Sequence, residues 1–470
     1  MKKSRIIVLF RNDFRLHDNP ALYEASRNGE IIPVYIHEYS NHSKSMGSAQ
    51  KWWLHQSLKS FQTSLKNLDC QLYLFSGNTE VLLPDIVEST SADAVYWNRC
   101  YDPETYCRDL KIAARLKEQN VQVKSFEGHL LRPPWEVVKE ENAPYKVFSA
   151  FYKAFLKEDV PNPYPVLKES VFADTELKGK SLSSLGLLPK KNWTETMEET
   201  WVPVENHAIE QFKDFCETKL AGYQETRDIP SSEGFSMMSP YLALGIISVR
   251  SMYHFLKDKP NSAPYIRQLI WRDYAYQLLF HFPSMHEISL DDRFKSFEWR
   301  TNEEGDFDAW KHGRTGFPIV DAGMRELWAT GYLPNRVRMI SASFLVKDLL
   351  IPWQKGSEWF WDTLIDADLA NNSMGWQWVA GTGIDPAPYF RIFNPVLQGE
   401  KFDKEGLYIK KWVPELKDLP AKYIHDPSKA PDHVLKEAGI ELGADYPFPI
   451  VDHKAARKRA LEHFGKIKKG

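Results

Sequence analysis

The sequence has few cysteines and no long apolar run, and both features limit what the protein can be. Its four cysteines form no CxxC pair, which argues against a zinc site and against a disulfide framework. No stretch approaches the roughly 20 apolar residues that a membrane-spanning helix needs. The first residues place charges directly after a short apolar run, unlike a secretory signal. We therefore expect a protein of a reducing, cytoplasmic compartment, without a membrane partner.

Several common catalytic motifs are also missing. No GxGxxG follows the first apolar run, and there is no GxxxxGK[ST], GxSxG or HExxH. These absences exclude the usual dinucleotide, P-loop, serine-hydrolase and zinc-protease sites. His281 and His286 lack the spacing of metal ligands on a helix, so no metal site is predicted. If the chain is an enzyme, a cofactor carries the chemistry.

The charge balance excludes a uniformly basic protein. The formal net charge is −3 over 470 residues, with 26% charged and 43% hydrophobic residues. This is the composition of a folded globular chain and not of a largely disordered one. A nucleic-acid partner would therefore need a local basic patch.

The first part of the chain alternates short β-rich runs with helical stretches. The predicted strands are 5–10, 31–37, 70–75, 93–98 and 121–126. Strands that alternate with helices predict an α/β domain with a parallel sheet and helices on both of its faces. We assign this domain to residues 1–128.

The rest of the chain divides into a connector and a helical part. Repeated prolines mark residues 129–202 as a connector, with a short helix near 148–157. From residue 203 to 470 the apolar spacing is helical almost throughout. The predicted fold is therefore an α/β domain joined to a larger all-α domain.

Polar and aromatic residues recur at helical spacing in the second half, where most of the 16 tryptophans lie. Gln268 and Trp271 are three residues apart, and Asn335 and Met339 are four apart, so each pair shares a helix face. Trp376 and Trp378 are two apart and face roughly opposite ways. Core packing explains any one such stripe. A flat heterocyclic ligand is the alternative, because buried amides need partners.

Four segments carry a resemblance to a known family. They are VLFRNDFRLHDNPAL near the N-terminus, the stretch from GFPIVDAGMRELW to KDLLIPW, DADLANNSMGWQW, and APYFRIFNPVLQGEKFD. From about residue 5 to about 416 the chain resembles the photolyase/cryptochrome family, most closely the class I cyclobutane pyrimidine dimer photolyases. The resemblance implies a Rossmann-like antenna domain at the N-terminus, followed by a helical domain that binds FAD.

The resemblance also implies a set of FAD-binding residues. Arg338 and Asp366 would pair beside the flavin ring, Asp368 would lie at its polar edge, and Asn372 would face N5. Phe235 departs from the family, which usually has a hydroxyl residue there. The implied cofactor-binding residues are Tyr223, Arg227, Ser236, Ser239, Arg272, Arg338, Asp366, Asp368 and Asn372.

The implied activity is light-driven repair of UV-damaged DNA, in which reduced FAD donates an electron to a flipped-out pyrimidine dimer. Met339 would line the lesion pocket, and Gln268 and Asn335 would hydrogen-bond the lesion. Stacking on its bases is expected from Trp271 and Trp378. Three further cations would contact phosphates: Arg336, Arg391 and Lys401.

Two further family features concern light. Trp376, Trp353 and Trp299 would form an electron-transfer chain from the flavin to the surface, although three core tryptophans are the alternative. The YDPETYCRD segment at 101–109 lies where family antenna contacts occur but lacks the Asn-Glu pair of folate-binding members. A pterin, a deazaflavin, a flavin or no second chromophore all fit.

Gln268 leaves alternatives open, because dimer photolyases carry Glu at this position. (6-4) photolyases also have Gln there, but they place histidines where this chain has Asn335 and Met339. A cryptochrome-like photoreceptor is a further alternative, although the short segment after residue 416 favours repair. A light-independent flavoprotein is the last. We expect a monomeric repair enzyme.

Overall fold

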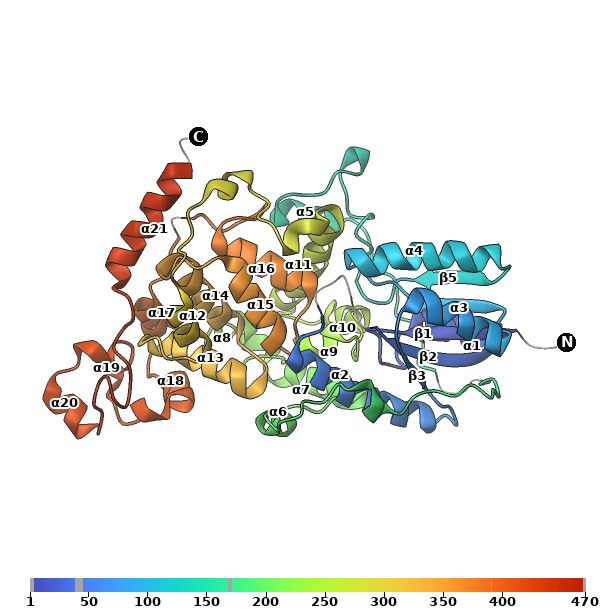
Figure 1. The fold of residues 1–470 in the computed structure, drawn as a ribbon, viewed down its shortest axis with the longest axis horizontal. Coiled ribbons are helices and arrows are strands. Elements are labelled where there is room, and N and C mark those ends of the chain that lie inside the picture. The colour runs from blue at the N-terminus through green and yellow to red at the C-terminus, as the bar shows by residue number, and fades with distance from the viewer. Residues whose placement is uncertain (1–3, 39–44, 168–170, 390, 468–470) are drawn as a thin grey trace. The chain divides into compact units, whose positions relative to one another are not determined.

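A five-stranded parallel sheet organises the N-terminal part of the computed structural model, which describes residues 4–38, 45–167, 171–389 and 391–467 (Figure 1). The strand order is β3-β2-β1-β4-β5, and each neighbouring pair is parallel. The predicted α/β class is confirmed. The strands are β1 (Arg5–Phe10), β2 (Glu30–His37), β3 (Tyr73–Ser76), β4 (Ala94–Asn98) and β5 (Gln122–Phe126).

Helices connect the strands, and apolar side chains of strands and helices form the sheet core. Ile7, Leu9, Val34 and Val95 belong to this core and are almost fully buried, as expected for a parallel sheet covered by helices. Side chains of Asn19, Asn78 and Asp102 accept backbone hydrogen bonds at the starts of the helices that follow them. The connecting helices are α1 (Pro20–Asn28), α2 (Ser48–Lys66), α3 (Thr79–Thr90) and α4 (Pro103–Glu118).

The chain forms two compact units. Unit 1 comprises Met1–Ala221 and Ser236–Pro283, and unit 2 comprises Gly222–Phe235 and Ser284–Gly470. The sequence boundaries at 128 and 202 both fall inside unit 1. That unit therefore contains the sheet, the connector and the first long helices of the second half.

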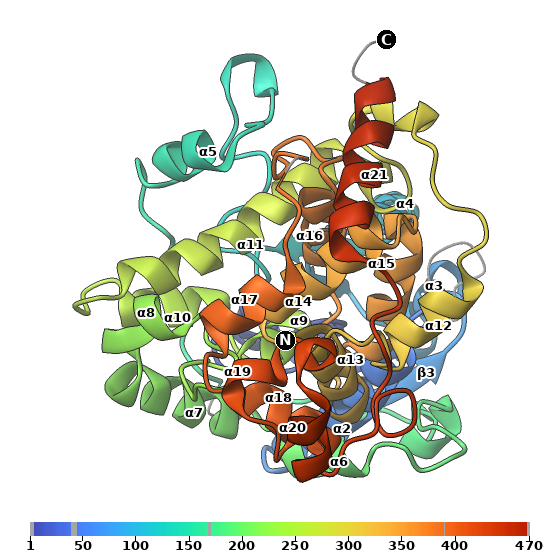
Figure 2. The same ribbon diagram turned by 90° about the vertical axis from the view of Figure 1, so that its left-hand side faces the viewer.

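Unit 1 adds a layer of helices to the sheet. The long helix α11 is packed by α10 and by α5, the short helix of the connector, which lies beside it in both ribbon views (Figure 2). The helix expected near 148–157 is thereby confirmed. The additional helices of unit 1 are α5 (Phe148–Phe155), α6 (Glu195–Thr200), α7 (Glu205–Thr218), α9 (Ser239–Ala243), α10 (Val249–Leu256) and α11 (Ala263–His281).

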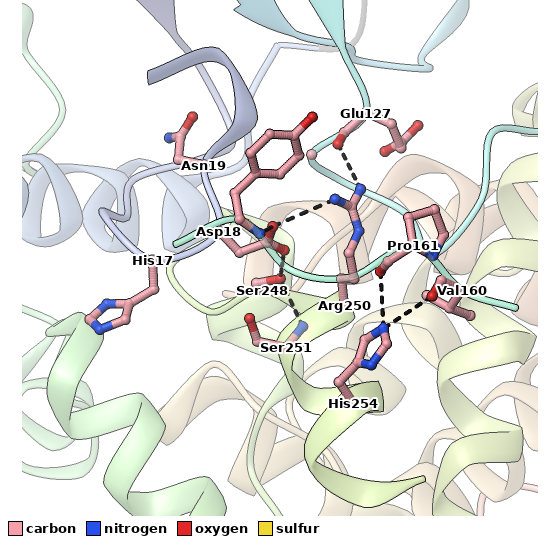
Figure 3. Close-up of polar contacts among 12 residues, drawn as sticks. His17, Asp18, Asn19, Glu127, Val160, Pro161, Ser248, Arg250, Ser251 and His254 are labelled. Atoms are coloured by element: carbon pink, nitrogen blue, oxygen red, sulfur yellow. Dashed lines mark hydrogen bonds and ion pairs between the residues drawn. The ribbon is translucent and has the colours of Figure 1, made fainter. Parts of the chain in front are cut away.

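A buried charge network joins the loop after β1 to the connector and to α10 (Figure 3). The Asp18 carboxylate accepts hydrogen bonds from the Ser248 hydroxyl and from the backbone N–H of Tyr164, the latter at 2.7 Å. Its other contact is an ion pair with Arg250 at 3.5 Å. Arg250 also donates to the Glu127 carbonyl at 2.8 Å. Asp18 and Arg250 are 1% and 4% exposed, so each depends on the other for charge compensation.

Unit 2 is built of helices around an aromatic core. Trp310, Phe344, Trp353, Phe360 and Trp376 are all nearly inaccessible to solvent within it. Within the described ranges no helix combines the length and apolar character that a membrane crossing requires. Its helices are α8 (Tyr223–Thr226), α12 (Glu304–Lys311), α13 (Pro318–Thr330), α14 (Asn335–Ser343), α15 (Trp353–Thr363), α16 (Leu369–Ala380), α17 (Pro395–Phe402), α18 (Leu407–Trp412), α19 (Ala421–Ile424), α20 (Asp432–Glu437) and α21 (His453–Ile467).

A carboxyl group lies in the packed interface between α13 and α18. The Tyr408 hydroxyl donates a hydrogen bond to Glu326. Burial raises the pKa of the Glu326 carboxyl to about 7, although this hydrogen bond and the positive charges of Lys411 and Arg338 act in the opposite direction. The folded protein therefore holds a proton here that the unfolded chain releases at lower pH.

Replacing Asp18 with Ala should destabilise the protein by about 3–5 kcal/mol, because Arg250 would keep a buried and uncompensated charge. The free energy of unfolding, from denaturant titration, is the measurement. Asp69→Ala is the matched control, because Asp69 also has a positive φ, 55° against 47° for Asp18, but is exposed. A loss for Asp18→Ala no larger than for Asp69→Ala would show that the ion pair contributes nothing.

Glu326 should make stability depend on pH. The pKa of its carboxyl is raised in the folded protein. Its favourable contribution to the free energy of unfolding is therefore complete below about pH 4.5 and is lost as the pH rises through about 7. Relative to wild type, Glu326→Gln should therefore gain on the order of 1–3 kcal/mol between pH 5 and pH 8. Unfolding at both pH values tests this, with the exposed Glu405→Gln as control. A pH-independent difference would contradict it.

Candidate functional site

The candidate residues are distributed over both units. In unit 1, Gln268 and Trp271 lie on the half-buried side of α11, whereas residues 272–279 of this helix are buried. The predicted shared face of Gln268 and Trp271 is therefore present. The Gln268 side-chain nitrogen donates to the Pro264 carbonyl at 3.1 Å, which holds the amide along the helix.

Arg272, one residue further along α11, contacts the interior of unit 1. Its guanidinium donates to the His129 carbonyl and to the His129 ring Nε2, both at 2.7 Å. It also lies 5.1 Å from the Tyr276 ring centroid. Burial, and then the charge of Arg272, lower the pKa of His129 well below its usual range, so the ring is a neutral acceptor. A role of Arg272 at FAD stays a prediction.

The two predicted serines of unit 1 differ in their surroundings. The Ser236 hydroxyl accepts a hydrogen bond from the Tyr265 hydroxyl at 2.8 Å. Ser239 is exposed and begins α9. Both follow Phe235, the last residue of unit 2 before the chain returns to unit 1. Their hydroxyls have the chemistry of phosphate donors.

In unit 2, Tyr223 and Arg227 bracket the short helix α8. The Arg227 guanidinium lies 5.4 Å from the Tyr223 ring centroid. The next residue, Asp228, forms an ion pair with Arg336 of α14 at 2.6 Å. Arg336 therefore fixes α8 to α14, and its predicted phosphate contact would compete with a protein carboxylate.

The predicted ion pair between Arg338 and Asp366 is present. One guanidinium nitrogen lies 2.6 Å from a carboxylate oxygen of Asp366, and Nε donates to the Leu333 carbonyl at 2.6 Å. The carboxylate side chain is only 2% exposed, against 27% for the arginine. Burial is the largest single effect and lowers the pKa of Arg338, but the combined influence of Asp366, Tyr332 and Glu326 outweighs it and leaves this pKa raised. The guanidinium therefore stays positively charged beside Asp366.

Helix α16 carries three predicted residues. Asp368 is its N-cap and accepts hydrogen bonds from the backbone and side chain of Asn371 at 2.8 and 2.7 Å. The Asn372 side-chain nitrogen donates to the backbone and hydroxyl oxygens of Ser357, both at 3.1 Å. Neither bond uses the side-chain oxygen of Asn372. One turn later, Trp376 is buried, and no described residue accepts a hydrogen bond from its indole N–H.

Gly356 makes room for Trp376. A Cβ on this glycine would lie 2.1 Å from the Trp376 ring, a distance that no side chain permits. The neighbouring Ser357 is the partner of Asn372. Two small residues of α15 thus position the amide and the indole of α16. The only sign of this in the sequence is a Gly-Ser pair inside a helix.

The residues of unit 2 that are predicted to contact the lesion lie on α14 and α16. The Asn335 side-chain nitrogen contacts the Met339 sulfur at 3.6 Å, so the expected pair on α14 is formed. Met339 and Trp378 both pack against the aromatic core while remaining half-buried. Trp376 is 2% exposed, which confirms that Trp376 and Trp378 face different surroundings.

The three tryptophans of the predicted electron-transfer chain all belong to unit 2. Trp353 is fully buried and donates to the Ser289 hydroxyl at 3.1 Å. Trp376 is nearly as buried, and Trp299 is half-buried. Burial thus decreases toward Trp299, as a path to the surface requires. The path itself stays a prediction.

The three cations predicted to bind phosphates differ in their exposure and in whether a carboxylate of the protein pairs with them. Arg336 pairs with Asp228 and lies 4.4 Å from the Phe402 ring centroid. Lys401 is exposed and lies 5.0 Å from the same ring. Arg391 is exposed, and its backbone carbonyl accepts a hydrogen bond from the buried Lys347 at 3.1 Å. Arg391 and Lys401 are the better placed of the three for an anionic polymer.

The predicted antenna segment lies at the carboxyl ends of β1 and β4, where the strand order reverses and ligands commonly bind in such sheets. Arg11 pairs there with Asp109 at 2.5 Å. The Tyr101 hydroxyl donates to Glu127, and Asp102 caps α4. These groups are used within the protein, so they do not identify a second chromophore.

The residues of unit 2 fit a flavin. Asn372 offers a side-chain oxygen, and the indole N–H of Trp376 on the same helix face is buried without a described acceptor. A planar heterocycle with both N–H and carbonyl groups offers a donor for the Asn372 oxygen and an acceptor for the Trp376 N–H. The Arg338–Asp366 pair adds a cation and an anion. Residues such as these would hold FAD and orient its ring.

Comparison with known proteins supports this interpretation. The family model described as DNA photolyase matches residues 6–167, and the model for the FAD binding domain of DNA photolyase matches residues 265–466. The chain is 45% identical to the deoxyribodipyrimidine photo-lyase of Agrobacterium fabrum, over 100% of this chain and 99% of the relative. It is 38% identical to cryptochrome-2 of Arabidopsis thaliana, over 97% of this chain and 78% of the relative.

A solved structure gives the same result. A bacterial class III photolyase from Agrobacterium tumefaciens superimposes with a TM-score of 0.96 at 45% identity, over 100% of this chain and 99% of that one. The expectation of a class I likeness is therefore not retained. The quoted motifs identify the family, whereas the class depends on differences that these motifs do not carry.

Proposed function

The chain belongs to the photolyase/cryptochrome family, and we propose that it splits cyclobutane pyrimidine dimers in UV-damaged DNA with the energy of light. The observation that carries this proposal is its 45% identity, over the full length of both chains, to a protein named deoxyribodipyrimidine photo-lyase. FAD held by residues such as Arg338, Asp366 and Asn372 would, when reduced and excited by light, supply the one-electron chemistry that opens the cyclobutane ring without net oxidation or reduction.

The protein residues bind and orient the reacting groups. Trp271 in unit 1 and Trp378 in unit 2 are half-buried aromatic surfaces, and stacking on a base is worth about 1–3 kcal/mol. Such stacking offsets part of the cost of extruding the lesion. Asn335, steadied by its contact with Met339, offers an amide to a base edge. Arg391 and Lys401 attract the phosphates, which hold the duplex without reading its sequence.

The composition of α14 favours dimer repair over (6-4) repair. Asn335 and Met339 form the pair at which (6-4) photolyases carry histidines, and neither residue transfers protons near neutral pH. The similarity to a plant cryptochrome keeps a photoreceptor as the second candidate. In our proposal the protein acts as a monomer in the cytoplasm, and any second chromophore is a light collector that repair does not require.

Illumination of the chemically reduced protein with dimer-containing oligothymidylate should restore absorbance near the thymine maximum. Gln268→Glu should keep this activity, and Gln268→Ala should weaken lesion binding by about 0.5–1.5 kcal/mol, the size of one buried hydrogen bond. Binding to intact DNA at the same salt concentration should not change, because it depends on phosphates. Gln62→Ala, at a half-buried glutamine of α2, is the control.

Two results would contradict this assignment. Repair of (6-4) lesions without repair of dimers would make Gln268 a better guide to the substrate than Asn335 and Met339. Photoreduction of bound FAD without repair of either lesion would favour the photoreceptor.

Trp353→Phe should slow light-driven reduction of oxidised FAD at least 10-fold if Trp353 relays electrons. Repair by chemically reduced protein needs no electron from the three tryptophans, so it serves as the internal reference. Trp53→Phe is the matched control, because Trp53 is equally buried and also loses one indole hydrogen bond, to the Pro240 carbonyl at 2.9 Å. Equal losses of photoreduction and repair would identify Trp353 as a packing residue.

A further inference from the structure

Trp271 of α11 has one face of its ring covered by an aromatic residue from another helix. The Phe148 ring lies parallel to it, with the centroids 3.5 Å apart and an angle of 8° between the planes. Phe148 begins α5 and is 2% exposed, whereas Trp271 is half-buried. A buried ring thus supports a ring that still reaches solvent.

Helix α5 is held in place by its own apolar face. Phe148, Phe151 and Phe155 recur at three and four residues and are all buried, so they form one stripe on α5. The helix itself packs beside α11 (Figure 2). Phe151 packs on Tyr274 with centroids 5.1 Å apart. The Phe148 ring also approaches Tyr274, at 5.6 Å. The helix that carries Phe148 is therefore anchored independently of the contact with Trp271.

A cation closes the cluster on the exposed side. The Arg267 guanidinium, one turn before Trp271, lies 5.2 Å from the Phe148 ring centroid and 5.4 Å from that of Tyr152. Such contacts restrict the rotamers of the residues involved. Arg267 is itself exposed, so the cluster ends at the surface on which Gln268 and Trp271 lie.

The arrangement differs from ordinary core packing. Trp53 and Trp310 are buried completely, as a residue that only fills volume would be. Trp271 instead has one face fixed by Phe148 and part of its surface open. A rigid aromatic ring with an accessible surface loses little conformational entropy when a flat ligand stacks on it.

We propose that Phe148 is a positioning residue for lesion recognition, because it holds the Trp271 ring in the orientation that stacks on an extruded pyrimidine. This inference rests on the proposed function and adds a specific residue to it. Phe148 acts through Trp271 and does not touch DNA. It therefore contributes to affinity for damaged DNA and not to affinity for intact DNA, nor to the binding of FAD.

The test measures dissociation constants for one oligonucleotide with and without a single thymine dimer, at fixed salt. Phe148→Leu keeps an apolar side chain without a flat face. It should weaken binding of the damaged strand about 3- to 10-fold, the effect of leaving one large side chain to be ordered on binding. Binding of the intact strand and the flavin content should stay the same. In steady-state repair, KM should rise and kcat should change less.

Phe151→Leu is the matched control, since Phe151 is equally buried on α5 but contacts Tyr274 and not Trp271 in this cluster. It should leave the ratio of damaged to intact binding unchanged. If Phe148→Leu fails to fold, Phe148→Met fills a similar volume and takes its place. A double-mutant cycle with Trp271→Leu adds the decisive comparison: the two losses should not add, because Phe148 acts only through Trp271.

The outcomes separate this inference from the proposed function. Wild-type protein that binds both strands equally and repairs nothing would overturn the proposed function itself. If both Phe148 variants keep the wild-type preference for the damaged strand over the intact strand, only the role of Phe148 is overturned. Additive losses in the cycle, or an equal loss in Phe151→Leu, would show that α5 merely stabilises the fold.

Discussion

The buried charges of the loop after β1 are the constraint on which unit 1 depends. Arg15 is 1% exposed and donates to the carbonyls of Asp18, Gly128 and Gly245, so its hydrogen-bonding capacity is spent on backbone. Asp18 compensates Arg250 of α10. Since a buried charge without its partner is costly, the loop, the end of the sheet and the helical layer must form together. The N-terminal motif that indicates the family is thus structural, and its role is to join these parts.

In unit 2, the comparable requirement is that the side chains of α16 are held in precise positions. Gly356 admits the Trp376 ring, and Ser357 orients the Asn372 amide. A larger residue at 356 would displace the indole, and loss of the serine hydroxyl would remove one of the two hydrogen bonds that hold the amide. Sites that must hold a flat group within a fraction of an ångström need such supporting residues. Since α15 also contributes Trp353 to the core, the packing of one helix sets the position of several candidate residues.

The sequence predicted the elements better than their partners. Short apolar runs identified all five strands of the sheet, and the short helix expected near 148–157 in the proline-rich connector is α5. Spacing also placed Asn335 beside Met339. It did not predict that Arg272 contacts His129 or that Arg336 pairs with Asp228. Those partners come from segments distant in the sequence, and periodicity on one helix carries no information about them. The stack between Phe148 and Trp271 was missed for the same reason.

The charge distribution explains why aromatic placement matters so much in this protein. The chain has a net charge of −3, and of the three candidate phosphate contacts Arg336 is already paired with Asp228. Nonspecific affinity for DNA comes from neutralised phosphates, so in the proposed function it would rest on a few exposed cations such as Arg391 and Lys401. Extrusion of a lesion would then have to be offset mainly by stacking, at about 1–3 kcal/mol per base. A tryptophan that must first be ordered would lose part of that gain. On this proposal, residues that fix the aromatic surfaces before DNA arrives would determine how well damaged DNA is distinguished from intact DNA.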